Sequence, residues 1–267
     1  MRVVFGGGAR ATAWSDEPLV LEPATPSASV LWNGKRYRGV LAFAAVDTAI
    51  LVVNRLPLES YLRGVVPLEL GLRSPNEAAA LEAQAIAARS YTVVRMREAV
   101  AAPYDLTSGA FDQVYGGREV EHPLADAAVD ATTGLVLMYD GKVVRAPYHS
   151  TCGGQTIAVT EAWSGVRDEG FLRGVSDARE GGGAWCDISP RFRWERTLDR
   201  RALDDAVSRY VRAHGAGMLV AGGAVRSARI ESRTRSGRVA ALVFETDGGA
   251  MRLAGTEMRT TLRSARG

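Results

Sequence analysis

The sequence is poor in cysteine, with only Cys152 and Cys186 among its 267 residues. Two cysteines exclude a fold held together by a framework of several disulfides. They are compatible with one bridge in an oxidising compartment or with two free thiols in a reducing one. The chain also has no apolar run of about 18 residues, which excludes a membrane-spanning helix.

The sequence lacks a strong excess of charge of either sign. It has 33 Lys and Arg against 30 Asp and Glu, a formal net charge of +3. The basic residues are spread along the chain, so the sequence does not indicate a nucleic acid partner. The first residues lack the long apolar core of a signal peptide, a segment that an exported protein loses on maturation.

Short β-rich runs separated by turn residues occur near both ends of the chain and in its middle. Asn33-Gly34 and Asp140-Gly141 each lie between two such runs, a pattern that predicts two-residue hairpin turns. The runs LAFAA and TAILVV, within residues 41–53, are further predicted strands. Near the C-terminus, turns at Ser236-Gly237 and Asp247-Gly248 predict a β-meander.

Helical patterns lie between these β-rich segments. Pro57 opens a short predicted helix, which Pro67 is expected to end or interrupt. Ser74, Pro75 and Glu77 form a helix start signal for an Ala-rich helix to about Glu98. Further helices are predicted in HPLADAAVDAT and in TLDRRALDDAVSRYVRAHG, the second ended by Gly215.

Strands and helices are therefore grouped rather than strictly alternating, which favours an α+β fold. We expect antiparallel hairpins and a meander packed with the Ala-rich helix, and a glycan-binding cleft. The predicted organisation is a β-rich segment (1–45), a catalytic core (46–190), and a C-terminal helix and meander (191–267). The last segment either completes the same domain or forms a small lobe.

Glu69 is the most suggestive single residue because it lies in the otherwise apolar run VVPLEL. Apolar surroundings raise the pKa of a carboxyl group toward neutrality and suit it to proton transfer. Val65, Val66, Leu68 and Leu70 are the neighbours that would supply such a pocket. From the residues alone, a solvated surface position remains the alternative for a single Glu.

Four blocks in this order resemble the domain shared by stage II sporulation protein D and the amidase enhancer proteins of bacterial cell-wall metabolism. They are LPLESYLRGVVPLEL, EAAALEAQAIAARSYTV, YDLTSGAFDQVYGG, and YHSTCGGQT followed by Trp163 and FLRGVSD. Members of the sporulation type are lytic transglycosylases that cleave peptidoglycan glycan strands lacking stem peptides. The resemblance implies that Glu69 is the catalytic acid and that Arg89, Phe171 and Arg173 lie at positions important for activity.

A lytic transglycosylase needs one carboxyl group, whereas glycoside hydrolysis usually needs two. The acid protonates the leaving glycosidic oxygen, and its carboxylate then takes a proton from the sugar's own C6 hydroxyl. That hydroxyl closes on C1 and leaves a 1,6-anhydro-muramic end. The alternative is a non-catalytic enhancer that binds the wall or activates a partner N-acetylmuramoyl-L-alanine amidase.

Several polar residues are candidates for contact with the glycan. Arg89 would bind sugar hydroxyls or the lactyl carboxylate of muramic acid, or would pair with Glu82 or another acid on the helix face. Gln113 and Tyr115 would line the cleft, or pack within the loop. Trp163 would form a sugar platform, or be buried. Asp105 and Asp112 are acids whose ordinary role is solvation or turn capping.

The segment STCGGQT has several interpretations. As a tight Gly-rich loop, it would shape the cleft through Ser150, Thr151, Gly153 and Gly154. A nucleophilic Cys152 activated by His149, and a metal site using His149, Cys152 and Cys186, are weaker alternatives. A Cys152–Cys186 disulfide fits an exported protein, and two free thiols remain the alternative.

The sequence therefore predicts a protein that needs no cofactor and no metal. Its predicted partners are peptidoglycan glycan strands and a cell-wall amidase, with no nucleic acid. Its predicted location is the bacterial cell envelope or the exterior.

Overall fold

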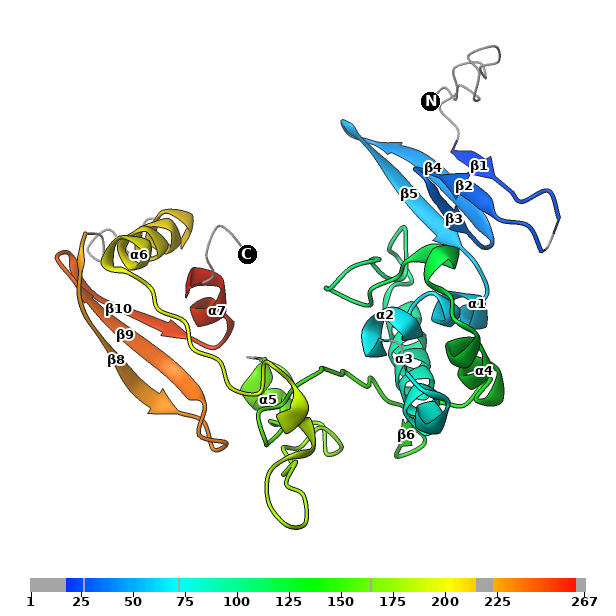
Figure 1. The fold of residues 1–267 in the computed structure, drawn as a ribbon. Coiled ribbons are helices and arrows are strands. Elements are labelled where there is room, and N and C mark those ends of the chain that lie inside the picture. The colour runs from blue at the N-terminus through cyan, green and yellow to red at the C-terminus, as the bar shows by residue number, and fades with distance from the viewer. Residues whose placement is uncertain (1–17, 26, 72, 164, 215–222, 263–267) are drawn as a thin grey trace. The chain divides into compact units, whose positions relative to one another are not determined.

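The computed structural model describes residues 18–25, 27–71, 73–163, 165–214 and 223–262. The chain divides into two compact units, an N-terminal unit (residues 1–148) and a C-terminal unit (residues 149–267) (Figure 1). Helices and antiparallel strands are grouped within each unit, which confirms the predicted α+β class. The boundaries predicted at residues 45/46 and 190/191 stay predictions.

The N-terminal unit begins with two small antiparallel sheets. One sheet has the order β1-β4-β5, and the other is the β2-β3 hairpin. Their bounds are β1 Leu19–Leu21, β2 Val30–Trp32, β3 Lys35–Tyr37, β4 Val40–Val46 and β5 Ala49–Arg55. Val30, Leu41 and Phe43 form the buried cluster beneath these strands. Both sheets precede the helices in sequence, as the pattern predicts.

The predicted hairpin turns are confirmed. Asn33 and Gly34 have φ of 49° and 74° between β2 and β3. Asp140 and Gly141 have φ of 47° and 71° between β6 (Met138–Tyr139) and β7 (Lys142–Val143). Positive φ at both central residues matches the right-handed twist of the flanking strands, which is why Asn-Gly and Asp-Gly occur there.

The helices of the N-terminal unit pack around one core. They are α1 (Leu58–Arg63), α2 (Val66–Leu70), the short 3-10 turn η1 (Pro75–Glu77), α3 (Ala78–Glu98), the 3-10 turn η2 (Gly117–Val120) and α4 (Pro123–Ala131). Ser74 and Glu77 form the predicted capping box before α3. The core combines Val65 and Val66 with small residues of α3 and α4, among them Ala85, Ala88 and Ala128. Small side chains let these helices approach closely.

The expected role of Pro67 was wrong. The first helix ends at Arg63, four residues before Pro67, and a new helix, α2, begins at Val66. Pro67 lies in the first turn of α2, where the missing backbone N–H of proline has no intrahelical partner to lose. Proline therefore helps to start the helix that carries Glu69, rather than ending the one before it.

The C-terminal unit contains a three-stranded sheet flanked by two helices. Strands β8 (Val225–Arg233), β9 (Val239–Thr246) and β10 (Gly249–Ala254) form the predicted meander, with turns at Ser236-Gly237 and Asp247-Gly248. Helices α6 (Arg200–His214) and α7 (Thr256–Leu262) contribute to its core. The predicted helix end at Gly215 lies outside the described residues.

Residues 149–199, which precede α6, have little regular structure. They contain α5 (Val159–Ala162), the 3-10 turn η3 (Trp185–Ile188) and two isolated β-bridges, Gln155 with Ser176 and Ala178 with Ala184. The sequence pattern indicates loops here, and it misses α5, as it misses β1, α2 and α7. Across the described residues, the helices include none that is both long and apolar enough to cross a membrane.

Candidate functional site

Glu69 lies on α2 and is half-buried. A residue distant in sequence, Val114, binds its carboxylate. Its Oε1 accepts a hydrogen bond of 2.7 Å from the backbone N–H of Val114. Val65 and Val66 are fully buried in the core, and Leu70 packs partly against it. Leu68 is 41% exposed. The apolar neighbours of Glu69 therefore chiefly anchor α2 to the core, while a backbone amide orients the acid.

Gln113, which precedes that amide, is fully buried and makes four side-chain hydrogen bonds. Its Oε1 accepts from the hydroxyls of Tyr61 at 3.0 Å and Thr92 at 2.8 Å. Its Nε2 donates to the Tyr148 hydroxyl at 3.1 Å and to the Ala88 carbonyl at 3.2 Å. A side chain enclosed in this way contacts a substrate only through the residues that it holds. Gln113 therefore holds the surrounding residues in place. Of the two expected roles, packing within the loop is observed and lining a cleft is not.

The two tyrosines bound to Gln113 are close to the charge of Glu69. Burial raises the pKa of Tyr61 and of Tyr148 far above the usual value, and the negative charge of Glu69 raises both further. Both phenols therefore stay protonated and remain hydrogen-bonding groups at all physiological pH values. Sequence reasoning missed them, although Tyr61 lies in the same block as Glu69 and Tyr148 begins the fourth block.

A cavity of about 740 Å³ opens on the side of the N-terminal unit where β5 and α1 meet residues 102–108. Aromatic residues are prominent in its lining: Trp32, Tyr37, Tyr61, Tyr104 and Tyr115. Asn54, Asp105, Thr107 and Ser108 add polar groups. The rings of Tyr61 and Tyr115 lie 5.1 Å apart in this lining, which does not include Glu69. The predicted contact of Tyr115 with a glycan stays a prediction. Aromatic and apolar walls with a few polar groups are the usual lining of a ligand pocket.

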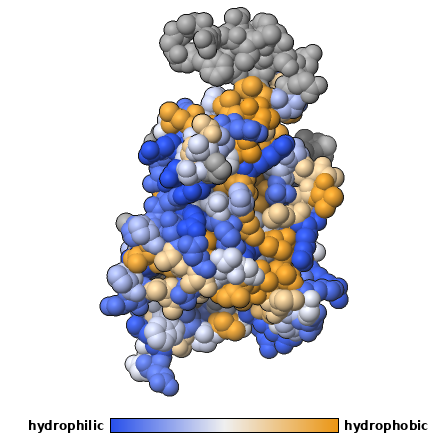
Figure 2. All heavy atoms as spheres, turned by 90° about the vertical axis from the view of Figure 1, so that its right-hand side faces the viewer, coloured by the Kyte–Doolittle hydropathy of each residue, from blue (hydrophilic) through white to orange (hydrophobic). Residues whose placement is uncertain are grey.

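Hydrophilic and hydrophobic residues alternate in patches on the face that Figure 2 shows.

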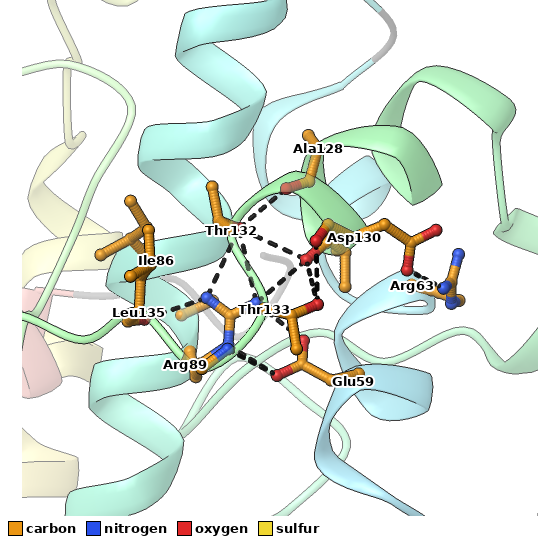
Figure 3. Close-up of polar contacts among 12 residues, drawn as sticks. Glu59, Arg63, Ile86, Arg89, Ala128, Asp130, Thr132, Thr133 and Leu135 are labelled. Carbon is orange, nitrogen blue, oxygen red and sulfur yellow. Dashed lines mark hydrogen bonds and ion pairs between the residues drawn. The ribbon is translucent and has the colours of Figure 1, made fainter.

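Arg89 is buried, with only 1% of its side chain exposed. Its Nε and Nη2 donate to the two carboxylate oxygens of Glu59 at 2.9 and 2.7 Å, and its Nη1 donates to the Leu135 carbonyl at 3.0 Å (Figure 3). The guanidinium thereby joins α3, α1 and the turn after α4. This corrects the expected direct contact with sugar: Arg89 pairs with an acid, but with Glu59 rather than Glu82.

Asp112 organises the loop that leads to Val114. Its carboxylate accepts hydrogen bonds from the N–H and the hydroxyl of Thr107, both at 2.9 Å, and from Tyr91 and Arg95, both at 3.0 Å. Burial alone would raise the pKa of Asp112, but the hydrogen bonds from Thr107 and Tyr91 together lower it below the usual value. The turn-organising role expected of a loop acid is therefore observed.

The other predicted contact residues belong to the C-terminal unit. The Thr151 hydroxyl donates a 2.7 Å hydrogen bond to the Ser189 hydroxyl, and Gly153 and Gly154 have φ of 77° and 105°. Ser150 and Arg173 are exposed, and Phe171 is half-buried. Trp163 is 47% exposed, so the expected alternative of burial does not hold. Within the N-terminal unit the structure gathers Glu69, Gln113 and Tyr115. That the residues of the C-terminal unit join them remains a prediction.

The two cysteines lie beside each other in the C-terminal unit as free thiols. Their Sγ atoms are 3.3 Å apart, and the carboxylate of Asp177 completes a group within 4.8 Å. Sequence reasoning missed Asp177. His149, expected beside Cys152 in two weaker interpretations, is not part of this group among the described residues.

Comparisons with known proteins point to one family. Residues 46–139 match the family described as "SpoIID: Stage II sporulation protein". An uncharacterized protein of Brachyspira hyodysenteriae is 38% identical over 125 residues, covering 46% of this chain and 33% of that protein. The amidase enhancer of Bacillus subtilis is 34% identical over 190 residues, covering 70% of this chain and 24% of the relative. Stage II sporulation protein D of the same species is 29% identical over 166 residues, covering 57% and 46%. The chain thus spans less than half the length of each of these relatives.

Proposed function

We propose that this protein, which belongs to the stage II sporulation protein D family through residues 46–139, cleaves peptidoglycan glycan strands without water. Its product would be a 1,6-anhydro-muramic end, and Glu69 would be its acid and base. The strands would lack stem peptides. The single observation that carries the proposal is the position of Glu69, a half-buried carboxylate oriented by the Val114 amide beside two protonated tyrosines.

The geometry supports a mechanism with one carboxyl group. Glu69 would protonate the glycosidic oxygen, and the resulting carboxylate would accept the proton of the C6 hydroxyl as that oxygen bonds to C1. The Val114 N–H binds one carboxylate oxygen. The second oxygen is then the one available to the sugar. A fixed amide also limits rotation of the acid, which favours alignment with the scissile bond.

The cavity of the N-terminal unit supports binding of a glycan. Tyr61 and Tyr115 line the cavity, whereas Glu69 does not, and the two tyrosines connect to Glu69 through Gln113 and Val114. Aromatic faces stack on the apolar faces of sugar rings, and Asp105 and Ser108 offer polar groups for hydroxyls. Arg89 would act on this site only indirectly, by fixing α1 and α3.

A second candidate function is that of a non-catalytic enhancer of a cell-wall amidase. The observation that favours it is the 190-residue match to the amidase enhancer of Bacillus subtilis, which is longer than the 148-residue N-terminal unit. That match therefore extends into the C-terminal unit, beyond the segment that carries Glu69. Either function would place the protein in the bacterial cell envelope or outside the cell.

One pair of assays tests the proposal. Purified protein and its Glu69→Gln variant are incubated with stem-free glycan strands, and products are identified by mass spectrometry. The proposal predicts anhydro-muramic ends from the unmodified protein alone. If neither protein yields them, while both stimulate a purified N-acetylmuramoyl-L-alanine amidase equally, the enhancer function is correct.

A further inference from the structure

Residues 149–199 form a long segment with almost no hydrophobic core. Among the described residues of this segment, the buried apolar side chains are Val159 and Ala184, and neither belongs to a core cluster. By contrast, the rest of the C-terminal unit buries large side chains such as Phe244, Met251 and Leu253. A segment that buries so little apolar surface gains too little free energy to offset the entropy of ordering its chain. Covalent cross-links commonly hold such segments in exported proteins.

Both cysteines of the chain lie in this segment. Cys152 lies in the Gly-rich loop, Cys186 lies in η3, and their half-buried Sγ atoms are 3.3 Å apart. Cys152 and Cys186 are 34 positions apart in sequence, so the fold rather than chain proximity brings the two thiols together. We propose that Cys152 and Cys186 form a disulfide that fastens the Gly-rich loop to η3.

Asp177 already holds both cysteine-bearing stretches in place. Its carboxylate accepts a 3.0 Å hydrogen bond from the N–H of Cys186, and its own N–H donates to the Gly154 carbonyl at 3.1 Å. Thr151 and Ser189 add a 2.7 Å hydrogen bond between the same two stretches. The two sulfurs thus lie 3.3 Å apart before they react, and closing the bond would bring them to about 2.05 Å.

The bond forms by ordinary thiol–disulfide exchange with a disulfide-bearing oxidant of the envelope. One cysteine thiolate attacks the oxidant's disulfide and forms a mixed disulfide. The second cysteine thiolate then displaces the oxidant's remaining sulfur, so the Cys152–Cys186 bond forms and the oxidant leaves as a dithiol. The two protons lost by the cysteines end on the two thiols of the reduced oxidant.

A zinc ion held by the two sulfurs and Asp177 is the competing occupant of this group. Two thiolates on a tetrahedral zinc lie ~3.8 Å apart, given Zn–S bonds of about 2.3 Å. The sulfurs here are 3.3 Å apart, between that value and the roughly 2.05 Å of a disulfide. A structural zinc site takes four ligands, whereas the group among the described residues offers three, Cys152, Asp177 and Cys186. The shortage of ligands favours the disulfide.

The disulfide would fix the shape of the loop that carries Thr151, Gly153 and Gly154. Arg238 supports the same loop by donating to the carbonyls of Cys152 at 3.0 Å and Gln155 at 2.8 Å. Arg193 donates to the Gly153 carbonyl at 3.0 Å. This inference about the bond does not depend on the proposed function, because the bond is measured without any activity assay.

The test uses the full chain equilibrated with oxidised and reduced glutathione. Under non-reducing conditions, we expect the intact mass to be about 2 Da below that of the reduced chain, with no alkylation by iodoacetamide. A peptide linking Cys152 to Cys186 should appear after digestion. Reduction, or the double change Cys152→Ser and Cys186→Ser, should lower the melting temperature of the C-terminal unit by several degrees.

The Asp177→Asn variant separates the two occupants. An asparagine oxygen still accepts from the N–H of Cys186, so the disulfide should form as in the unmodified chain, whereas a zinc site would lose its charged ligand. Both cysteines remaining alkylatable under oxidising conditions would overturn the inference. So would one equivalent of bound zinc that protects the thiols until a chelator is added and that is lost in Asp177→Asn.

Discussion

The backbone N–H of Val114 donates a 2.7 Å hydrogen bond to the carboxylate of Glu69, across 45 positions of sequence. This bond links the helix that carries the acid to a loop fixed by buried groups. Gln113 anchors the loop on one side through four hydrogen bonds. Asp112 anchors it on the other through Thr107, Tyr91 and Arg95. The orientation of Glu69 therefore depends on residues whose side chains are enclosed by the N-terminal unit.

Replacing Gln113 by Met should weaken both stability and activity. The methionine fills a similar volume but leaves the Tyr61 hydroxyl without its acceptor inside the protein. We expect a loss of about 2–3 kcal/mol in the free energy of unfolding, measured by urea denaturation. Activity on stem-free glycan strands should fall at least about tenfold at saturating substrate, because a shifted Val114 amide no longer aligns Glu69.

The exposed Gln155 provides a matched control, since Gln155→Met changes the same group at a solvated position. It should alter stability by less than about 0.5 kcal/mol. If Gln113→Met lowers stability but leaves kcat unchanged for the folded fraction, the network supports the fold without positioning the acid.

Removing the guanidinium of Arg89 should destabilise the N-terminal unit strongly. In Arg89→Met, Glu59 loses its bidentate partner in a partly buried position. A broken buried ion pair costs about 3–5 kcal/mol, and we expect the lower end because Glu59 is 29% exposed. The double variant with Glu59→Gln should recover part of the loss.

The exposed pair of Arg36 and Glu119 gives the comparison for this prediction. Arg36 is 64% exposed in that pair, so Arg36→Met should cost no more than about 1 kcal/mol. Equal losses from Arg36→Met and Arg89→Met in chemical denaturation would contradict the structural role given to Arg89.

Gly64 is a position where the close approach of Tyr115 excludes a larger residue. A Cβ on Gly64 would lie 2.5 Å from Cε2 of Tyr115 and 3.0 Å from the Gly117 carbonyl oxygen. Gly64→Ala should therefore cost about 1–3 kcal/mol and displace Tyr115 from the cavity. Gly109→Ala is the control, because a Cβ there meets nothing within 4 Å. Thermal unfolding measures the melting temperatures of both variants. A Gly64→Ala variant as stable as Gly109→Ala would contradict the close contact between Gly64 and Tyr115.

Asp112 should make the stability of the protein depend on acid pH. Its folded-state pKa lies below the usual value, so its carboxylate stabilises the fold above the unfolded pKa of about 3.9. That stabilisation is lost as the pH falls through the lower, folded pKa. Asp112→Asn should lower stability at neutral pH and flatten its decline between about pH 5 and pH 2, in urea titrations.

Asp105→Asn removes an exposed carboxylate from the same loop and serves as the reference. It should change the free energy of unfolding at neutral pH by less than about 0.5 kcal/mol. If the free energy of unfolding of Asp112→Asn falls with acid pH as steeply as that of the unmodified protein, other carboxylates cause the fall.

Local sequence signals predicted much of the fold. Asn33-Gly34 and Asp140-Gly141 specify turns through their own backbone preferences, and Ser74 with Glu77 marks a helix start within four residues. Pro67 was misjudged because proline ends a helix in its interior but starts one in its first turn. The choice between these depends on Val65 and Val66 packing into the core, which a local pattern does not contain.

The site was less predictable because its organisation is non-local. Glu69 follows from its block, but its amide partner comes from Val114, 45 positions later. Arg89 and Gln113 looked like surface ligands because polar side chains are mostly exposed. Their burial follows from partners such as Glu59 and Tyr148, which only the folded chain brings near. The Asp177 contact with Cys186 arises in the same way.

The most direct test of the proposed function is the comparison of the unmodified protein with Glu69→Gln on stem-free glycan strands. Glutamine keeps a carbonyl oxygen for the Val114 N–H, so the variant should fold with unchanged stability while losing its exchangeable acid proton. We predict a fall of at least about 100-fold in the rate at which anhydro-muramic ends appear in mass spectra. Equal rates from the two proteins would contradict the assignment of Glu69 as the acid.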